Sequence, residues 1–376
     1  MHAIGLEMGK GLVSKDLPKP EIRRDDEVLY RTLEVGICGS DRSVIQYDRN
    51  DPPPGETFMA LGHEGLAVVE AVGRGVKKLK AGDLIVPTVR RGCGKCASCA
   101  NQQSDMCATG EYRERGLHKL HGFLAEYAVD SEEYLVRVPP DLRDLAVLAE
   151  PLSIAEKVMQ TIDFVQQRFP WACPVDERQR RGPDEWGYCR TALVFGAGPI
   201  GFLVACLLRK AAVRTFVLEN KDETNPRVAL IRALGAEYVD SRGVTPQEIP
   251  DKLGPLDIIV EATGVSDYAL QLIPAVSRNG VYVFTGVPRG GGSQVTLDGN
   301  LVLRQIVRMN QIIAGVVNSN RSHFEAAIAD LAALKRKFPS VMGQVIGSRI
   351  PVRDFAAAAA ALTAKDREKI KVVLTF

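Results

Sequence analysis

The chain has 376 residues, too many for one ordinary hydrophobic core, and its length predicts two domains. Hydrophobic residues at 45% and charged residues at 25% are typical of a soluble globular protein. A formal net charge of +2 is nearly balanced, which argues against a nucleic-acid-binding protein.

The N-terminal residues 1–7 lack the basic start and apolar core of a signal peptide, and no apolar run approaches the roughly 18 residues of a membrane-spanning helix. We therefore expect a cytoplasmic protein with no membrane partner. Eight cysteines in that compartment predict metal ligands and free thiols rather than a disulfide framework. Whether Cys173 and Cys189 pair depends on how closely their backbones approach and stays open.

Short strands separated by Gly and Pro turns dominate the first third of the chain. Residues 27–35 alternate loosely between apolar and polar side chains, which predicts a half-buried strand that delivers Cys38 to a loop. Further strands are expected over residues 65–72 and 84–87. Many short strands favour an all-β domain or a partly open barrel.

A candidate metal site involves residues from three places in the chain. His63 and Glu64 are adjacent and flanked by glycines, Cys38 precedes them, and Glu150 follows much later. Thiolate, imidazole and carboxylate are ligands of zinc, and a catalytic zinc keeps one position open. Taken alone, His63 would more often be a core or turn residue, so the hypothesis depends on the neighbouring motifs.

A second cysteine set predicts a structural metal. Cys93, Cys96 and Cys99 are spaced by two residues, and Cys107 completes a four-thiolate site of the closed kind that ties down an irregular loop. An iron–sulfur cluster is less favoured, because no Cys-Pro ending follows. A nucleic-acid zinc ribbon is less favoured still, because no second Cys or His pair follows. We therefore expect two zinc ions per chain.

Residues 141–168 are predicted to be helical, and residues 170–188 form a polar insertion that we interpret as a surface loop at a domain boundary. We accordingly predict a first domain over 1–188, to which 319–376 return, and a second domain over 189–318.

The second domain opens with a nucleotide-binding pattern. An apolar strand over 191–195 runs into Gly196-Ala197-Gly198-Pro199-Ile200-Gly201 and then a helix over 202–211, and the next strand ends at Glu219. Glycines between a strand and a helix, with an acidic residue about 20 positions further on, are typical of a dinucleotide site. The strands and helices that follow alternate, with one helix expected over residues 268–276, which predicts a doubly wound parallel sheet.

The predicted cofactor-binding residues lie in the glycine turn and at the ends of later strands: Gly196, Gly198, Pro199, Ile200, Gly201, Glu219, Asn220, Lys221, Thr263, Thr285, Gly286, Val287, Val316, Val317 and Asn318. A carboxylate at Glu219 hydrogen-bonds the ribose hydroxyls and favours NAD, whereas Lys221 could attract a 2′-phosphate. We expect NAD preference with NADP tolerated. The alternative, that Glu219 is an ordinary exposed acid at a strand end, stays open.

With these motifs in place, the chain resembles the archaeal-type glucose 1-dehydrogenase family of the zinc-dependent medium-chain dehydrogenase/reductase superfamily over essentially its full length. The shared phrases are residues 86–91, 120–123, 134–137, 150–153, 196–201, 261–264 and 317–319. The resemblance implies an α/β two-domain fold, a GroES-like partly open β-barrel catalytic domain followed by a Rossmann domain.

The resemblance also implies residue roles. Cys38, His63 and Glu150 would hold the catalytic zinc, with Glu64 a ligand or the group that exchanges with one. Asp41 would steady the zinc-bound His63. Ser40 would lie beside the reacting alcohol and pass its proton outward, with Glu64 as the candidate acceptor. The implied sugar contacts are Ser40, Glu114, Glu150 and Asn318, whereas Val89 and Ile154 are apolar where some members are polar, which leaves the preferred aldose open.

The implied reaction is oxidation of an aldose, D-glucose or a close relative, at C1 to the lactone, with hydride transfer to NAD(P). Another polyol or alcohol dehydrogenase of the superfamily is the main alternative. A non-catalytic nucleotide-binding relative is a more distant one. The family's members commonly form dimers or tetramers, so we expect a homo-oligomer.

Overall fold

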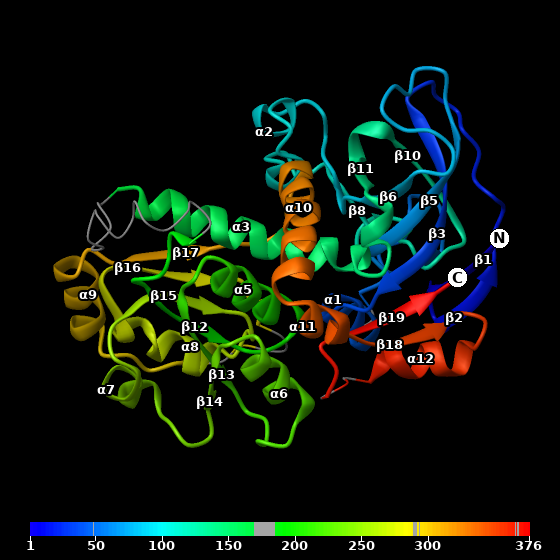
Figure 1. The fold of residues 1–376 in the computed structure, drawn as a ribbon. Helices are drawn as coiled ribbons and strands as arrows, with labels where there is room; N and C mark the ends of the chain where they lie inside the picture. The colour runs from blue at the N-terminus through cyan, green and yellow to red at the C-terminus, as the bar shows by residue number, and fades with distance from the viewer. Residues whose placement is uncertain (48, 169–184, 289–291, 293, 365, 367) are drawn as a thin grey trace. The chain divides into compact units, whose positions relative to one another are not determined.

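The computed structural model describes residues 1–47, 49–168, 185–288, 292, 294–364, 366 and 368–376 (Figure 1). Two compact units are present. The first comprises Met1–Ser153, Asn318–Ala333 and Val345–Phe376, and the second comprises Ile154–Val317 and Leu334–Gln344. Most of the predicted 170–188 insertion lies outside the described residues, as does Cys173 and hence its pairing with Cys189.

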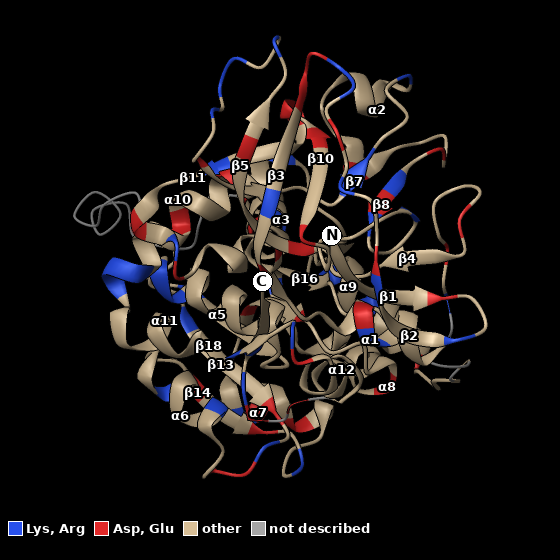
Figure 2. Ribbon diagram, turned by 90° about the vertical axis from the view of Figure 1, so that its right-hand side faces the viewer, with Lys and Arg blue, Asp and Glu red and all other residues tan. Residues whose placement is uncertain are grey.

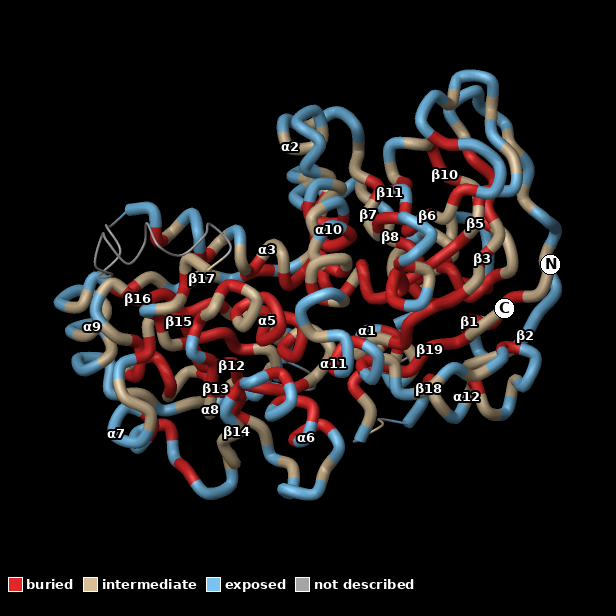
Figure 3. Tube along the Cα trace, in the orientation of Figure 1, coloured by how far each residue is buried: buried red, intermediate tan, exposed pale blue. Residues whose placement is uncertain are grey.

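A seven-stranded sheet forms the centre of the first unit, in the order β11-β6-β5-β3-β19-β18 with β10 also paired to β3. Its strands are β3 (Glu27–Gly36), β5 (Glu64–Val72), β6 (Leu84–Pro87), β10 (Tyr127–Ser131), β11 (Leu135–Val138), β18 (Ile346–Pro351) and β19 (Lys371–Thr375). β19 pairs antiparallel with β3, so the C-terminal segment completes this sheet. Apolar residues of these strands form the buried core of the unit, which Figure 3 shows in red.

Two three-stranded sheets flank it. One has the order β2-β1-β4, with β1 (His2–Glu7), β2 (Gly11–Asp16) and β4 (Phe58–Ala60). The other has the order β7-β8-β9, with β7 (Arg90–Arg91), β8 (Arg113–Arg115) and β9 (Lys119–Leu120). The helices near these strands are α1 (Gly39–Gln46), α2 (Ala97–Ala100) and α12 (Phe355–Thr363). The β-rich character predicted for this part of the chain is confirmed.

The second unit contains a six-stranded sheet in the order β14-β13-β12-β15-β16-β17, and every neighbouring pair in it is parallel. Its strands are β12 (Thr191–Phe195), β13 (Arg214–Glu219), β14 (Glu237–Asp240), β15 (Leu256–Glu261), β16 (Val276–Phe284) and β17 (Ile312–Gly315). The helices are α3 (Ala149–Gln166), which begins in the first unit, α5 (Pro199–Lys210), α6 (Pro226–Ala233), α7 (Ile249–Leu253), α8 (Ser266–Gln271) and α9 (Gly299–Arg308). The strand order reverses at β12, as in doubly wound nucleotide-binding sheets, and the predicted fold class is confirmed.

α10 (Arg321–Lys337) and α11 (Pro339–Val345) belong partly to each unit. None of the helices in the described ranges combines the length and the apolar character needed to span a bilayer.

Three local predictions differ from the structure. The helix expected over 141–168 begins only at Ala149, after two short 3-10 turns. The helix expected over 268–276 stops at Gln271, because Pro274 follows in a 3-10 turn and cannot donate a helical hydrogen bond. Cys38 lies in a two-residue connection and is the N-cap of α1, a helix that the loop prediction missed.

The N-terminal segment of the first unit ends at Ser153, earlier than the boundary expected at residue 188. The side chains of α3 account for this difference. Lys157 Nζ donates to the Val317 carbonyl at 3.1 Å, and Gln166 Nε2 donates to the Asn279 carbonyl at 3.2 Å. Both acceptors belong to the second unit, so most of α3 packs with that unit.

Candidate metal, cofactor and sugar sites

The side chains of Cys38, His63 and Glu64 converge in the first unit, with one ligand atom from each lying within 4.8 Å of the others. Strand pairing brings them together, because Gly36 at the end of β3 is opposite Glu64 at the start of β5. A Cβ at Gly36 would lie 2.1 Å from Glu64 Oε2, so a side chain at this position would displace the carboxylate. Thiolate, imidazole and carboxylate at this separation fit a zinc ion.

Asp41 contacts both Cys38 and His63 and orients them. Its buried carboxylate accepts a hydrogen bond from the Cys38 backbone N–H at 2.8 Å and faces His63 Nδ1 at 3.1 Å. Burial opposes the charged form of Asp41, but the facing His63 lowers its pKa below the ordinary value. Because Nδ1 is engaged, Nε2 of His63 is the nitrogen left for a metal. This is the position that a carboxylate steadying a metal-bound histidine occupies.

Lys371 is a member of the site that the sequence analysis missed. Its ammonium, on β19, lies 2.7 and 2.5 Å from the two Glu64 carboxylate oxygens and 3.3 Å from the Ile37 carbonyl. Both side chains are only 1% exposed. Burial disfavours the ammonium, yet the Glu64 charge raises the pKa of Lys371. The sequence feature that could have indicated Lys371 is a lysine at the start of a mainly apolar C-terminal strand.

Glu150 does not join the group of three ligand atoms that share the 4.8 Å sphere. It is half-buried at the start of α3, and burial raises its pKa to about 7, with Glu64 adding to the rise and His63 opposing it. Its side chain would have to move to share an ion with Cys38 and His63. Ser40 is exposed, and its Oγ lies 3.8 Å from Cys38 Sγ.

The second cysteine set also converges. The sulfurs of Cys93, Cys96, Cys99 and Cys107 all lie within 4.8 Å of one another. The Thr109 hydroxyl, followed by the backbone N–H groups of Lys95 and Cys96, lowers the pKa of Cys93 to about 6. A thiolate is the form that binds metal, so the four residues fit a closed zinc site.

Glu114 and Asn318, two of the four residues predicted to contact sugar, lie on either side of Arg90, which was not among the predicted site residues. Arg90 Nε donates to Glu114 Oε1 at 2.9 Å, and Arg90 Nη2 lies 2.6 Å from the amide oxygen of Asn318. The structure thus brings Glu114 and Asn318 to opposite sides of one guanidinium.

The glycine turn of the second unit is shaped for a phosphate. Gly198 is the N-cap of α5, and a Cβ built on it meets no protein atom within 4 Å. A Cβ on Gly201 would lie 2.0 Å from the Gly196 carbonyl oxygen, so the turn requires glycine there. The first backbone N–H groups of a helix attract anions, and the open space beside Gly198 allows a pyrophosphate to approach them.

Glu219 lies next to this turn. Its carboxylate accepts hydrogen bonds from the Ala197 N–H at 2.9 Å and the Asn220 N–H at 2.8 Å, and Lys221 Nζ lies 3.5 Å away. Burial opposes its charge, but the two backbone donors lower the pKa of Glu219.

The remaining predicted cofactor residues follow the ends of β15, β16 and β17. Thr263 donates its hydroxyl and its N–H to Glu261, both at 2.5 Å, and a Cβ on Gly286 would lie 2.2 Å from the Gly264 nitrogen. Thr285 and Val316 are buried, whereas Val287 and Val317 are 66% and 52% exposed. Pro199 and Ile200 begin α5.

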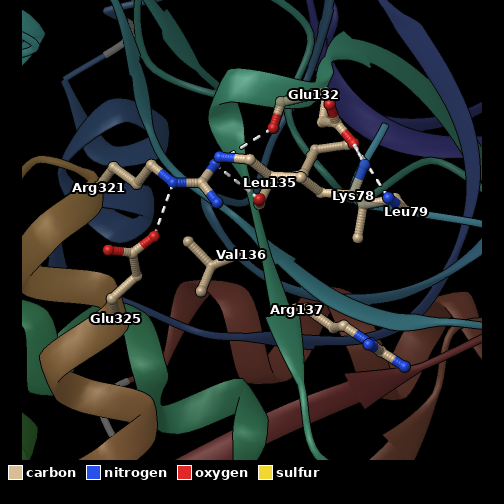
Figure 4. Close-up of a pocket in the computed structure, with 8 residues that line it drawn as sticks. All are labelled: Lys78, Leu79, Glu132, Leu135, Val136, Arg137, Arg321 and Glu325. Carbon is tan, nitrogen blue, oxygen red and sulfur yellow. Dashed lines mark hydrogen bonds and ion pairs between the residues drawn. The ribbon is translucent and has the colours of Figure 1, made fainter. Parts of the chain in front are cut away.

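A separate hollow of ≈ 240 Å³ is lined by Lys78, Leu79, Glu132, Leu135, Val136, Arg137, Arg321 and Glu325 (Figure 4). None of these is a predicted site residue. Among its charged residues, Glu132 accepts hydrogen bonds from the backbone N–H groups of Lys78 and Leu79, and Arg321 pairs with Glu325 at 2.7 Å. Figure 2 shows basic and acidic segments interspersed along the ribbon, in keeping with the net charge of +2.

Two family models match the chain. "Glucose dehydrogenase C-terminus" matches residues 143–376, and "Alcohol dehydrogenase GroES-like domain" matches residues 24–140. Glucose 1-dehydrogenase of Methanocella arvoryzae is 36% identical over 100% of this chain and 99% of its own length. Glucose 1-dehydrogenase 1 of Haloterrigena turkmenica is 34% identical, with the same coverage.

Solved structures agree with these matches. Haloferax mediterranei glucose dehydrogenase in complex with NADP, Zn and gluconolactone has a TM-score of 0.86 and 32% identity, over 100% of this chain and 99% of that one. Escherichia coli galactitol-1-phosphate dehydrogenase, at 21% identity and a TM-score of 0.78 over the full length of both chains, shares the fold. The chain belongs to the glucose dehydrogenase family of the zinc-dependent medium-chain dehydrogenase/reductase superfamily.

Proposed function

We propose that this protein oxidises D-glucose, or a closely related aldose, at C1 to the lactone, with zinc and NAD(P). The observation that carries the proposal is the convergence of Cys38, His63 and Glu64, three residues that strand pairing brings to one point. The relative of known structure that was solved with NADP, Zn and gluconolactone supports the same substrate and cofactors.

Each residue of the metal group has a separate task. When bound by these residues, zinc would supply Lewis-acid polarisation of the C1 hydroxyl. Cys38 and His63 hold the metal, and Asp41 keeps His63 Nε2 directed at it. Lys371 holds the Glu64 carboxylate in its charged form beside them. Glu150 is the alternative carboxylate ligand and requires a side-chain movement.

The hydroxyl proton leaves through Ser40, whose exposed Oγ lies 3.8 Å from Cys38 Sγ. Glu64, the other candidate acceptor, already has both carboxylate oxygens engaged by Lys371 Nζ, at 2.7 and 2.5 Å. The glycine turn of the second unit would hold the pyrophosphate of NAD(P), which when bound would supply the hydride acceptor.

NAD is the preferred cofactor and NADP is tolerated. Glu219 offers a carboxylate to ribose hydroxyls and repels a 2′-phosphate, whereas Lys221 partly offsets this repulsion. In a Glu219→Gln variant, the ratio of kcat/KM for NADP to that for NAD should rise about tenfold. If the ratio of kcat/KM for NADP to that for NAD is unchanged, Glu219 does not select the cofactor and is an ordinary acid at a strand end.

A homo-oligomer is supported by the surface of the second unit. β17 is the edge strand of the parallel sheet, and Leu303 and Val307 on α9 are 63% and 66% exposed. Unpaired strand edges and exposed apolar side chains favour association. Light scattering of a Leu303→Glu, Val307→Glu variant should show a smaller particle than the wild type. A cytoplasmic location is supported by six free cysteines among the described residues.

The decisive test is reduction of NAD and NADP across a panel of aldoses, polyols and simple alcohols, together with zinc analysis. Turnover of glucose or a close relative with two zinc ions per chain is expected. Faster turnover of a polyol or simple alcohol would favour another dehydrogenase of the superfamily. Zinc-loaded protein that binds NADH but oxidises nothing would favour a non-catalytic relative.

A further inference from the structure

Arg90 joins Glu114 and Asn318, two of the four side chains predicted to contact the sugar. It lies on β7 directly opposite Glu114 on β8, and the ion pair at 2.9 Å joins side chains that are only 12% and 13% exposed. Its Nη1 also donates to the Asp105 carbonyl at 2.6 Å, and its guanidinium carbon lies 3.9 Å from the Tyr112 ring centroid. These contacts fix the guanidinium plane.

The orientation of the Asn318 amide follows from this fixed plane. A guanidinium can only donate hydrogen bonds, so the Asn318 atom that faces it is the amide oxygen, at 2.6 Å from Nη2 and 3.3 Å from Nη1. The Asn318 backbone has a φ of 57°, a left-handed conformation that asparagine tolerates better than most residues. The amide NH2 group is therefore directed away from Arg90.

Glu114 offers a hydrogen-bond acceptor, whereas Asn318 offers a donor. Its Oε1 receives the Arg90 hydrogen bond, and Oε2 has no partner within the described part of the chain. An ionised carboxylate oxygen only accepts hydrogen bonds. By engaging Glu114 Oε1 and the Asn318 amide oxygen, Arg90 leaves one acceptor on Glu114 and one donor group on Asn318 for a ligand.

We infer that Arg90 is a positioning residue that sets the hydrogen-bond polarity of the sugar site. One sugar hydroxyl donates to Glu114 Oε2 and another accepts from the Asn318 amide. The inference rests on the proposed function, since it concerns the same aldose. Without the guanidinium, the amide can rotate and Glu114 loses the charge partner that turns Oε2 outward.

Two variants and one control test this role. Arg90→Lys keeps the charge but cannot bridge two partners in one plane, and Arg90→Gln removes the charge as well. Arg113→Gln removes an exposed positive charge from the adjacent strand β8 and is the matched control. Steady-state kinetics with glucose and with NAD, thermal unfolding, and calorimetric binding of gluconolactone are compared.

Both Arg90 variants should raise KM for glucose and weaken gluconolactone binding by about ten- to a hundredfold. Changes in kcat and in KM for NAD should stay within about threefold, and Arg113→Gln should resemble the wild type. Unchanged sugar affinity in both variants, with normal wild-type turnover, would overturn the inference alone. Parallel losses in glucose, NAD and thermal stability would also overturn it, because they indicate a merely structural role.

Sugar analogues give a readout that loss of stability cannot mimic. Fluorine accepts a hydrogen bond weakly but cannot donate one, so deoxy and deoxyfluoro glucoses are compared position by position. At the hydroxyl that faces Asn318, the fluoro sugar should bind better than the deoxy sugar; at the hydroxyl that faces Glu114, it should bind worse. This opposition should disappear in Arg90→Lys.

Equal binding of the two analogue types at every position in the wild type would overturn the inference. Failure of the wild type to bind or oxidise any aldose would instead overturn the proposed function and this inference with it.

Discussion

The first unit contains two cysteine-bearing metal groups that differ in construction. The four-cysteine group comes from one 15-residue stretch, residues 93–107, and its sulfurs are all half-buried. The Cys38 group draws its residues from the β3–α1 connection, the first turn of α1, the start of β5 and the start of β19, and His63, Glu64, Asp41 and Lys371 are buried. The first is held by a loop, whereas the second is held by a sheet.

This difference separates the roles of the two groups. Four thiolates leave no open position, so a metal there stabilises a loop that has few apolar residues of its own. In the Cys38 group, Asp41 engages His63 and Lys371 engages Glu64, so three residues would hold a metal there and a fourth ligand could come from outside the protein. Changes in one group should therefore mainly affect stability, and changes in the other mainly turnover.

The largest expected effect is on catalysis. Cys38→Ala should lower kcat/KM for glucose about 10⁴-fold, because the polarising metal supplies several kcal/mol of the barrier reduction. NADH binding, followed by fluorescence titration, should be retained because the glycine turn belongs to the second unit. Cys206→Ala, a change of the same size at a buried cysteine of α5, is the control and should keep full turnover. If Cys38→Ala keeps full turnover, the Cys38 group is not the catalytic one, and the two groups do not differ in role as described.

The next effect concerns the ion pair behind the catalytic group. Lys371→Met leaves the buried Glu64 carboxylate unpaired, which should cost about 3–5 kcal/mol in the free energy of unfolding. Urea denaturation measures this cost. Lys369→Met is the control, since its ion pair with Asp366 is more exposed and should cost less than about 1 kcal/mol. Equal costs in the two variants would show that Lys371 does not hold Glu64.

A smaller effect is expected at the four-cysteine group. Cys107→Ser should lose one zinc per chain and lower the unfolding temperature by about 5–10 °C. Because Arg90 donates to the Asp105 carbonyl within this loop, KM for glucose should rise while kcat falls less. Ser98→Ala, in the same loop but outside the metal group, is the control. Loss of kcat as large as that of Cys38→Ala would contradict the assigned stabilising role.

The smallest effect concerns the buried polar cluster around Asp130 in the first unit. Buried Asp130 pairs with Arg91 and Arg115 at 2.8 Å and accepts the Tyr30 hydroxyl at 2.6 Å. Burial opposes its charge, but Arg115 and Arg91 lower the pKa of Asp130 strongly. A lowered folded-state pKa stabilises the protein above the unfolded value of about 4, and this contribution is lost as the pH falls below it.

Tyr30→Phe removes one donor to Asp130 and should cost about 1–2 kcal/mol at pH 7. Because the two arginines keep the pKa of Asp130 low in both proteins, the carboxylate stays charged and this cost should be nearly unchanged at pH 3. Urea midpoints from pH 7 to pH 3 check this. A difference that shrinks steadily between pH 5 and pH 3 would show that Asp130 is protonated in that range and that the two arginines do not keep its pKa low.

The sequence located the local motifs well. The two-residue spacing of Cys93, Cys96 and Cys99 and the glycine turn at 196–201 act over a few residues, so their geometry is encoded in neighbouring positions. Errors appeared where local signals compete, as at the helix expected over 268–276, which Pro274 interrupts. The short helix α1 was missed because Asp41, read as a partner of His63, also caps the Cys38 N–H.

By itself, the sequence determined the fold class and the ligand types, because periodicity, glycine spacing and cysteine spacing are properties of short segments. The family followed from the resemblance of several phrases spaced along the chain. Only the tertiary structure decided which distant side chains meet. Lys371 reaches Glu64 because β19 pairs with β3, and Arg90 joins Glu114 to Asn318 through β7, β8 and the return of the chain. Such contacts depend on strand register and chain return, which no local pattern encodes.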